Sequence, residues 1–324
     1  MKKRILVLDL DTPCFSVASV CETRSVKVKH EPTGKEKVFK HRTEFKEMLS
    51  EKGKLDKLGE YSFTDIQEPE DISHALHSLK HMVERIKNDV EADEAIYCIS
   101  GDNNFRDNLE LPVKYKSNRA SMIRPVLLKE VRQYAIKKFN PVICHGQEAD
   151  DYIIYKGYEL QKSGCEPIIS SVDKDALAYS GLLIYNQDKP ELGVRRIPAL
   201  GNLWIDDKNK LRGQGFLWYC TQILIGDSVD GLKPTYLAGK KFGEKSAYAL
   251  LNDCKSEQEA LSVVVSKYKE WYNAPVTYTA WNGKEYTKDW FEMLHMYHKA
   301  IRMKEVKNDD LDLAKFFERY GLTL

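Results

Sequence analysis

The amino-acid sequence predicts an α/β fold built on a mainly parallel sheet flanked by helices. Apolar runs of the kind that form buried parallel strands occur at residues 5–8, 95–100, 141–144 and 166–172. Segments with helical periodicity separate these runs. Each run is followed closely by acidic residues, and open parallel sheets bind their ligands beyond the carboxyl ends of the strands. We therefore expect a ligand site at one edge of this sheet.

Length and composition limit the possible classes of protein. The 324 residues suffice for one large domain or two moderate ones, and we expect two. With 50 Lys and Arg against 49 Asp and Glu, the net charge is +1, so any attraction to nucleic acid must come from segregated charge. The 7 cysteines show no CxxC pair or zinc-type spacing, which indicates a reducing, cytoplasmic compartment. We expect no signal peptide and no membrane span, because the apolar runs are too short.

The N-terminal part predicts one strand followed by an irregular insertion. The first apolar run ends at Asp9, which taken alone also fits a turn or a helix cap. Residues 26–29 and 37–39 flank a turn sequence at 31–34 and predict a hairpin. We expect residues 50–70 to be irregular, because two glycines and a proline interrupt them.

The middle part repeats the first pattern and adds a basic segment. Residues 71–90 predict an amphipathic helix, and the strand at 95–100 is followed by Asp102 as the first strand is by Asp9. Between residues 114 and 138, eight Lys and Arg occur with Glu130 as the single acid. Such a run most often forms a solvated helix face, and contact with nucleic acid is the alternative.

The densest acidic segment lies at residues 147–179. Its helix begins with three acids and its strand is followed by two more: Glu148, Asp150, Asp151, Asp173 and Asp175. Acids at a helix N-terminus also suit the helix dipole, so the first three alone fit simple capping. Five carboxylates around one strand-and-helix unit repel one another, however, and hard divalent cations take several oxygen ligands from separate elements. The pattern favours a divalent metal site.

The C-terminal part contains a further acidic motif and a glycine turn. The sequence GDSVDG places Asp227 and Asp230 three residues apart. Residues 239–243 form a tight turn into a helix, whose free backbone amides suit a phosphate, although an ordinary helix connection explains the turn equally well. The other expected elements are strands at 182–185 and 203–205, and helices at 213–225, 244–251 and within the mainly helical 257–324.

Taken in order, the acidic motifs resemble those of the 5′-nuclease superfamily: Asp9, Asp102, Glu148-x-Asp150-Asp151, Asp173-x-Asp175 and Gly226-Asp227-x-x-Asp230. The likeness is to bacteriophage 5′–3′ exonucleases and flap endonucleases and to the 5′-nuclease domain of bacterial DNA polymerase I, over about residues 5–251. The resemblance implies a twisted PIN-like core at residues 1–205, with a basic helical arch at about 103–139. It implies a helical DNA-binding region with a helix-three-turn-helix element at residues 206–324.

The resemblance also implies roles for individual residues. Two Mg²⁺ ions, with Mn²⁺ as a substitute, would be held by Asp9, Asp102, Glu148, Asp150 and Asp151 and by Asp173, Asp175, Asp227 and Asp230. The implied catalytic set is Lys116, Arg106, Asp150 and Asp151, in which the two cations stabilise charge on the scissile phosphate. The implied DNA contacts are Arg106, Tyr115, Lys116, Arg119, Arg124, Lys240, Gly243 and Lys245.

The implied function is structure-specific 5′–3′ exonuclease or flap endonuclease activity in DNA replication or repair, on 5′ flaps or RNA primers. The expected partners are DNA with a free 5′ end, flap or nick, an RNA/DNA hybrid, and replication proteins, with the chain acting as a monomer away from membranes. Two other functions stay open: a non-catalytic, structure-specific DNA-binding protein and a PIN-like ribonuclease.

Three features depart from the family pattern. Asp9 is followed by Leu10 where the family has Asp-Gly. At the turn near Gly243, where the family often binds K⁺, its Gly-x-Gly is replaced by Lys241-Phe242-Gly243. The insertion at about 21–70 is longer than the family core requires.

Overall fold

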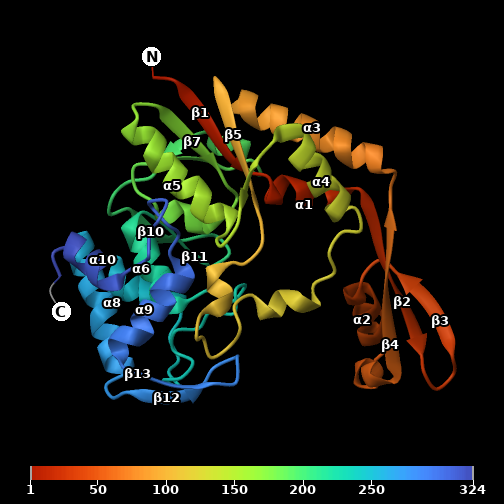
Figure 1. Cartoon of the computed structure of the whole chain (residues 1–324). Helices are drawn as coiled ribbons and strands as arrows, with labels where there is room; N and C mark the ends of the chain where they lie inside the picture. The colour runs from red at the N-terminus through yellow and green to blue at the C-terminus, as the bar shows by residue number, and fades with distance from the viewer. Residues whose placement is uncertain (1, 323–324) are drawn as a thin grey trace. The chain divides into compact units, whose positions relative to one another are not determined.

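A six-stranded sheet forms the centre of the first of two units in the computed structural model, which describes residues 2–322. Unit 1 comprises the described residues up to 10 together with 85–122 and those from 141 onward. Unit 2 comprises residues 11–84 and 123–140. Figure 1 shows the elements of both units along the chain.

The sheet of unit 1 has the strand order β6-β5-β1-β7-β8-β9. Its first five strands in this order pair in parallel, and β9 pairs antiparallel to β8. The predicted fold class is therefore confirmed, including the four strands that precede the acidic motifs. The strand bounds are β1 Arg4–Asp9, β5 Glu94–Ser100, β6 Val142–Cys144, β7 Glu166–Ser170, β8 Leu183–Tyr185 and β9 Arg195–Arg196.

Helix α5 (Ala149–Lys162) covers one face of this sheet. Its Ile154 is buried with Val7 of β1 and Ile169 of β7 in one apolar cluster. The helix approaches the sheet closely at Gly157, where an added Cβ would lie 3.0 Å from side-chain atoms of Ile169 and Leu182. This packing fixes the start of α5 beside the carboxyl ends of the strands.

The C-terminal helices of unit 1 share a second core. Phe216, Tyr268, Tyr297 and Phe317 are buried in it. Leu203 and Leu211 of a short hairpin pack into the same core, so the boundary predicted near residue 205 does not coincide with a break between compact units. The elements are α6 Phe216–Ile225, α7 Glu244–Leu251, α8 Glu257–Trp271, α9 Trp290–Ile301 and α10 Leu313–Arg319, with hairpins β10 Asn202–Ile205, β11 Leu211–Gln214, β12 Val276–Thr279 and β13 Glu285–Lys288.

Unit 2 contains a three-stranded antiparallel sheet in the order β3-β2-β4. The predicted hairpin is present, with the turn at residues 31–34. Residues 50–70, predicted to be irregular, instead contain strand β4, which pairs with β2 from Tyr61 opposite His30 to Pro69 opposite Glu22. The elements are α1 Asp11–Val20, β2 Glu22–His30, β3 Lys35–Phe39, α2 Arg42–Glu51, η1 Leu55–Glu60, β4 Tyr61–Pro69 and α4 Leu128–Phe139, while α3 Ile72–Asp89 crosses into unit 1.

A small apolar core holds α2 against this sheet. Val26 and Val28 of β2 meet Phe45 and Leu49 of α2, with Phe39 of β3. The strand β4 is hard to recognise in the sequence, because its apolar Tyr61, Phe63 and Ile66 form neither a continuous run nor a strict alternation.

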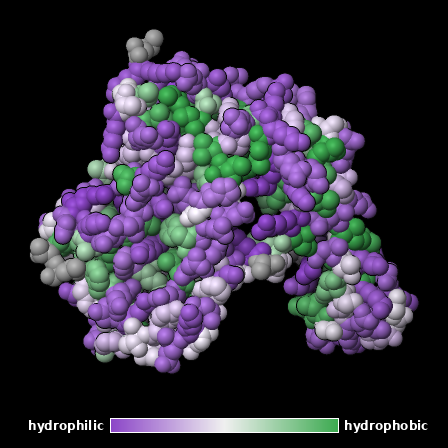
Figure 2. All heavy atoms as spheres, viewed as in Figure 1, coloured by the Kyte–Doolittle hydropathy of each residue, from purple (hydrophilic) through white to green (hydrophobic). Residues whose placement is uncertain are grey.

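Four short 3₁₀ helices complete unit 1: η2 Phe105–Asn108, η3 Ser117–Ser121, η4 Lys174–Ala178 and η5 Pro190–Leu192. The cysteines are free thiols. None of the helices within residues 2–322 combines the length and apolar character needed for a membrane crossing. Figure 2 shows a mostly hydrophilic visible face, with apolar side chains in scattered groups.

Candidate functional site

The candidate site lies in unit 1, beyond the carboxyl ends of neighbouring parallel strands. Asp9 ends β1, and Asp102 follows β5 by two residues. Glu148 caps α5 after β6, and Asp173 follows β7. Because parallel strands end at one edge of a sheet, the backbone brings these acidic motifs to a common side, as the sequence predicted.

The loop after α6 adds Asp227 and Asp230 to the same region. Gly226 has a φ of 75°, and an added Cβ there would lie 2.2 Å from the carbonyl oxygen of Leu232, so the tight return of this loop requires glycine. Asp227 accepts a hydrogen bond of 2.7 Å from the Val229 amide and forms an ion pair of 2.8 Å with Lys174. The ion pair joins the loop to the turn that carries Asp173 and Asp175.

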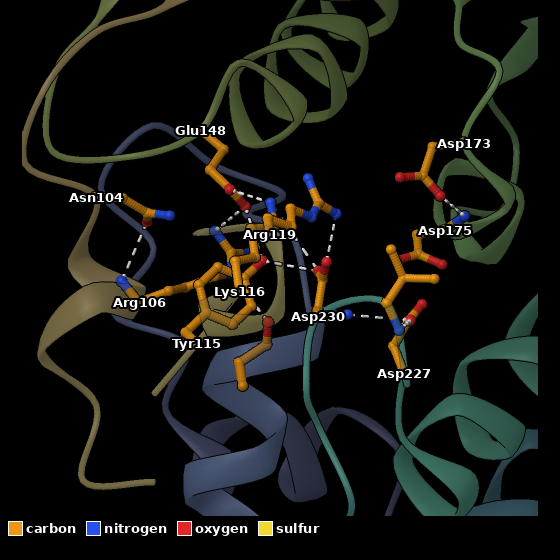
Figure 3. A network of polar contacts seen from close by, with 12 residues as sticks. Asn104, Arg106, Tyr115, Lys116, Arg119, Glu148, Asp173, Asp175, Asp227 and Asp230 are labelled. Carbon is orange, nitrogen blue, oxygen red and sulfur yellow. Dashed lines mark hydrogen bonds and ion pairs between the residues drawn. The ribbon is translucent and has the colours of Figure 1, made fainter. Parts of the chain in front are cut away.

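Three side chains of the predicted basic arch contact these acids. The Tyr115 hydroxyl oxygen lies 3.1 Å from both the Glu148 and the Asp230 carboxylates, and its single hydrogen can be donated to either. Lys116 pairs with Glu148 and lies 4.0 Å from Asp230, and Arg119 pairs with Asp230. Figure 3 shows this group together, with Asp173, Asp175 and Asp227 to one side.

A local backbone feature sets this arrangement. Lys116 adopts a left-handed conformation with a φ of 54°, which is uncommon for a residue with a side chain. Its amide donates a hydrogen bond of 2.9 Å to the carbonyl oxygen of Asp230. The backbone of the arch entry is thereby tied to the GDxxDG loop, and the side chains of Tyr115 and Lys116 are held over the carboxylates.

The acids away from these cations repel one another. Burial, followed by the charges of Asp173 and Glu148, raises the pKa of Asp150 to about 7. Burial also raises the pKa of Asp173, and burial with the Asp173 charge raises that of Asp175 well above its usual range. Asp227 differs: burial opposes ionisation, but the hydrogen bond and charge of Lys174 leave its pKa lowered. The region around Asp150 therefore favours bound positive charge.

Arg106 and Asp151 form a buried pair behind this cluster. Their exposed fractions are 2% and 0%. The guanidinium donates two hydrogen bonds to the two Asp151 oxygens, of 2.6 and 3.0 Å. It also donates to the carbonyl oxygens of Ala300 at 3.0 Å and Arg302 at 2.8 Å. Asn104 caps η2 by accepting from the Arg106 amide, which helps to turn this side chain inward.

The contacts of this pair favour roles for both residues other than the predicted ones. Asp151 also accepts from the Glu148 and Lys304 amides, both at 3.1 Å, so each of its oxygens already has two donors and offers no lone pair to a metal. Arg106 is buried among its partners and does not face solvent where a phosphate would bind. Burial opposes ionisation, but the charge of Asp151 outweighs it and raises the pKa of Arg106, so the guanidinium stays charged.

The donor chemistry of the cluster fits a hard divalent cation, although the ligands are not preassembled. Within residues 2–322, no three acidic, His or Cys side chains converge as a set that could hold a metal ion. The donors are all carboxylates, and burial together with mutual repulsion raises the pKa values of Asp150 and Asp175, an effect that a bound cation would oppose. Lys116 and Arg119 now contact the carboxylate oxygens. A bound cation would replace these side-chain contacts.

The remaining predicted residues are more widely spread. Asp102 is exposed and Asp9 half-buried. Arg124 belongs to unit 2, where its carbonyl oxygen accepts a hydrogen bond of 2.8 Å from Gln67. Lys240, Gly243 and Lys245 are exposed at the turn before and the first turn of α7.

Sequence reasoning missed several residues of the site. Lys174 pairs with Asp227, and its position inside the DKD motif could have indicated this role. Gln222 donates to Asp175 from α6, four residues before Gly226. The contacts of Ala300, Arg302 and Lys304 with Arg106 and Asp151 come from main-chain atoms, which carry no sequence signal.

Fold and site together define an α/β protein with an acidic cluster and adjoining cations at the carboxyl edge of a parallel sheet. No protein-family model and no curated protein sequence matches the chain. Among solved structures it is similar to the T5 D15 protein co-crystallised with metal ions, with a TM-score of 0.47 and 12% identity over 98% of this chain and 98% of that chain.

Two other T5 structures are similar. T5 5′-exonuclease with bound zinc has a TM-score of 0.44 and 14% identity over 98% of each chain. The bacteriophage T5 D15 flap endonuclease in a pseudo-enzyme–product complex with DNA and metal ions has a TM-score of 0.41 and 15% identity, covering 76% of this chain and 89% of that chain. These proteins are of the class that the acidic motifs resemble.

Proposed function

We propose that this protein is a divalent-metal-dependent 5′-nuclease that hydrolyses phosphodiester bonds in DNA with a free 5′ end, flap or nick. One observation supports it most: Glu148 and Asp230, from separate acidic motifs, meet Tyr115, Lys116 and Arg119 at the carboxyl edge of the sheet. Carboxylates suited to metal ions and cationic side chains suited to phosphate thus lie in one place. If the acids served only to cap a helix, Lys116 and Arg119 would not be needed beside them.

The chemistry divides between the two kinds of residue. Two divalent ions, when bound, would activate a water and stabilise the leaving oxygen. We assign one ion to Asp9, Asp102, Glu148 and Asp150, and the other to Asp173, Asp175, Asp227 and Asp230. Lys116 and Arg119 would exchange their carboxylate contacts for the phosphate and stabilise its developing charge. Mg²⁺ suits the all-oxygen donor set, with Mn²⁺ as a substitute.

The duplex would be held beside the turn that precedes α7. Gly239, with a φ of 61°, and Gly243 bound this turn, and Lys240 and Lys245 are exposed on it. The first backbone amides of a helix attract phosphate oxygens. A potassium ion at this turn stays a prediction, as does a role in replication or repair.

Digestion of end-labelled flap, nicked and blunt DNA, with Mg²⁺ and with chelator, tests the proposal. We expect metal-dependent cleavage from the 5′ side and products with 5′-phosphates. Matched RNA substrates identify a ribonuclease, and tight flap binding without cleavage identifies a non-catalytic DNA-binding protein. Release of 3′-phosphates, or full activity in excess chelator, would exclude the proposed reaction.

Two ligands of the second ion already have cation partners, Asp227 with Lys174 and Asp230 with Arg119, so we expect this ion to be weakly held. We expect Asp230→Asn to lower the cleavage rate at low metal and to recover in part at raised Mg²⁺ or Mn²⁺, since a weakened site refills by mass action. Cleavage rate measured against metal concentration checks this. A loss that no metal concentration reduces would show that the two acid sets act as one.

A further inference from the structure

The C-terminal strap, defined as residues 300–304, runs from the end of α9 behind the acidic cluster. It contributes main-chain groups to both members of the buried pair: the Ala300 and Arg302 carbonyl oxygens accept from Arg106, and the Lys304 amide donates to Asp151. Three segments that are distant in sequence therefore meet here, namely η2, the start of α5 and the strap. None of the acidic motifs includes the strap.

The strap is itself held in place on its far side. The Met303 amide donates to the Tyr179 hydroxyl at 2.5 Å. The buried Arg302 guanidinium lies over the Phe316 ring, 4.3 Å from its centroid, and pairs with Glu305. Met303 and Tyr179 belong to the apolar cluster of the sheet and α5, whereas Ala300 and Phe316 belong to the C-terminal core, so the strap is held by both cores.

The pair also controls the residue that begins the metal-binding helix. Asp151 accepts the Glu148 amide at 3.1 Å, and Arg106 lies 3.5 Å from the Glu148 carboxylate. Glu148 and Asp150 therefore depend on the orientation of Asp151, which in turn depends on Arg106 and the strap. An apolar pair could fill the same space with little loss of stability, but it could not accept the Glu148 amide.

We propose that Arg106 and the C-terminal strap position Glu148 and Asp150 for divalent metal, by holding Asp151 in its four hydrogen bonds. Arg106 is then a positioning residue, and its guanidinium does not touch the scissile phosphate. The inference rests on the proposed metal-dependent function. It adds that residues 300–304, held by both apolar cores, determine how tightly the acidic cluster binds metal.

Binding of Mn²⁺ to the free protein, without DNA, measures this role directly. Arg106→Lys keeps the charge but loses the planar fork that reaches two carboxylate oxygens and two carbonyls. We expect it to bind Mn²⁺ about 10- to 100-fold more weakly, the usual effect of losing a group that orients metal ligands. Duplex binding in Ca²⁺ should stay at the wild-type level. Weaker DNA binding with unchanged Mn²⁺ affinity would instead identify a phosphate contact and overturn the proposal.

A matched pair of strap variants separates the main-chain contact from the side chain. Lys304→Pro removes the amide that donates to Asp151, whereas Lys304→Ala keeps it. We expect weaker Mn²⁺ binding in the proline variant and wild-type binding in the alanine variant. Equal affinities in the two variants would show that the strap does not act on the site.

Hydrogen exchange keeps the test independent of metal. In chelator, Arg106→Lys and Lys304→Pro should lose protection of the Glu148 amide, which donates to Asp151, while the later amides of α5 stay protected. If the wild type binds no Mn²⁺, the proposed function fails, and unchanged protection in these variants would overturn the positioning role as well. Local loss of protection without Mn²⁺ binding would show that Arg106 and the strap hold Asp151, but it would overturn their proposed role in metal binding.

Discussion

Asp151 accepts four hydrogen bonds in a buried pair with Arg106, whereas burial, and then the charges of Asp173 and Glu148, raise the pKa of the preceding Asp150 to about 7. The two residues are adjacent in sequence and chemically identical. Successive residues of an α-helix point about 100° apart around its axis, so one faces the strap while the other is directed toward the acidic cluster. One carboxylate is paired with Arg106, whereas ionisation of the other is disfavoured.

This contrast shows that an acidic motif can mix two functions. The Asp151 carboxylate is held in one orientation by its ion pair and hydrogen bonds, and it needs no ligand to balance its charge. Ionisation of Asp150 is disfavoured, and strongly raised pKa values of this kind are concentrated at functional sites. The first three predictions below test whether the two aspartates differ as described, beginning with the largest expected effect.

Replacing each aspartate by asparagine should give opposite results. Asp150→Asn should fold normally, cleave DNA roughly 10²- to 10³-fold more slowly or worse, and bind DNA in Ca²⁺ as well as or better than the wild type, because less negative charge opposes the phosphate. Asp151→Asn should instead be destabilised, because an amide leaves Arg106 buried without its counter-charge. Single-turnover cleavage and urea unfolding measure the two effects.

The exposed Asp207→Asn serves as the matched control for both measurements. Similar stability and similar cleavage in the Asp150 and Asp151 variants would remove the distinction between the two residues.

The buried pair should behave as a unit in a double-mutant cycle. Arg106→Met alone leaves the Asp151 carboxylate buried and unpaired, which should lower the free energy of unfolding by about 3–5 kcal/mol. Adding Asp151→Leu removes that charge and should recover most of the loss. Urea unfolding of the two single variants and the double variant measures the coupling. Additive losses would mean that the two side chains stabilise the fold independently.

Part of this arrangement could be predicted from the sequence. The four parallel strands are continuous apolar runs, and the acids follow them directly, so the fold and the location of the site were accessible. The edge elements were harder: β4 has neither an apolar run nor a strict alternation, and β12 and β13 are short strands in a stretch predicted as helical. Asn282-Gly283 between them is a hairpin signal that could have identified the second case.

The division between Asp150 and Asp151 was not predictable in the same way. It depends on the rotation of α5 against β1 and β7 and on carbonyl groups of Ala300 and Arg302, which any residue types would supply. Likewise, Arg106 and Lys116 both appeared as cations of one basic segment. Only the three-dimensional arrangement separates the buried guanidinium from the ammonium group beside Glu148.

The pH dependence of stability gives a third measure of the contrast. The pKa of Asp150 is raised in the folded state, to about 7 from the usual 3.8. Its stabilising contribution is therefore fully present below about pH 4 and is lost as pH rises through about 7. In chelator, Asp150→Asn should gain stability relative to the wild type over this window, by at most about 1.4 kcal/mol per pH unit. Added Mg²⁺ should reduce the difference.

Asp227 supplies the opposite sign. Its pKa is lowered, because Lys174 outweighs the effect of burial, so its contribution is present above its ordinary pKa and is lost as pH falls through the lowered value. Asp227→Asn should therefore be less stable than the wild type at neutral pH. The free energy of unfolding of each variant is compared with that of the wild type at neutral pH in chelator. If both variants are more stable than the wild type, or both less stable, the two carboxyl groups do not differ in the way described.

The smallest expected effects concern residues that should bind DNA without taking part in the chemistry. Lys240 and Lys245 are exposed around the turn into α7, away from the buried pair. Each alanine variant should weaken duplex binding regardless of sequence and reduce the slope of log affinity against log salt by about 1, because one phosphate contact and its released counterion are lost. Single-turnover cleavage at saturating enzyme should change little, in contrast to Asp150→Asn.

The charge-matched control is Lys162→Ala, because Lys162 is exposed at the C-terminal end of α5, the end that does not carry the acidic motif. Binding measured at several salt concentrations decides the point: unchanged slopes in both variants would place the duplex elsewhere on the protein and leave the turn with a structural role.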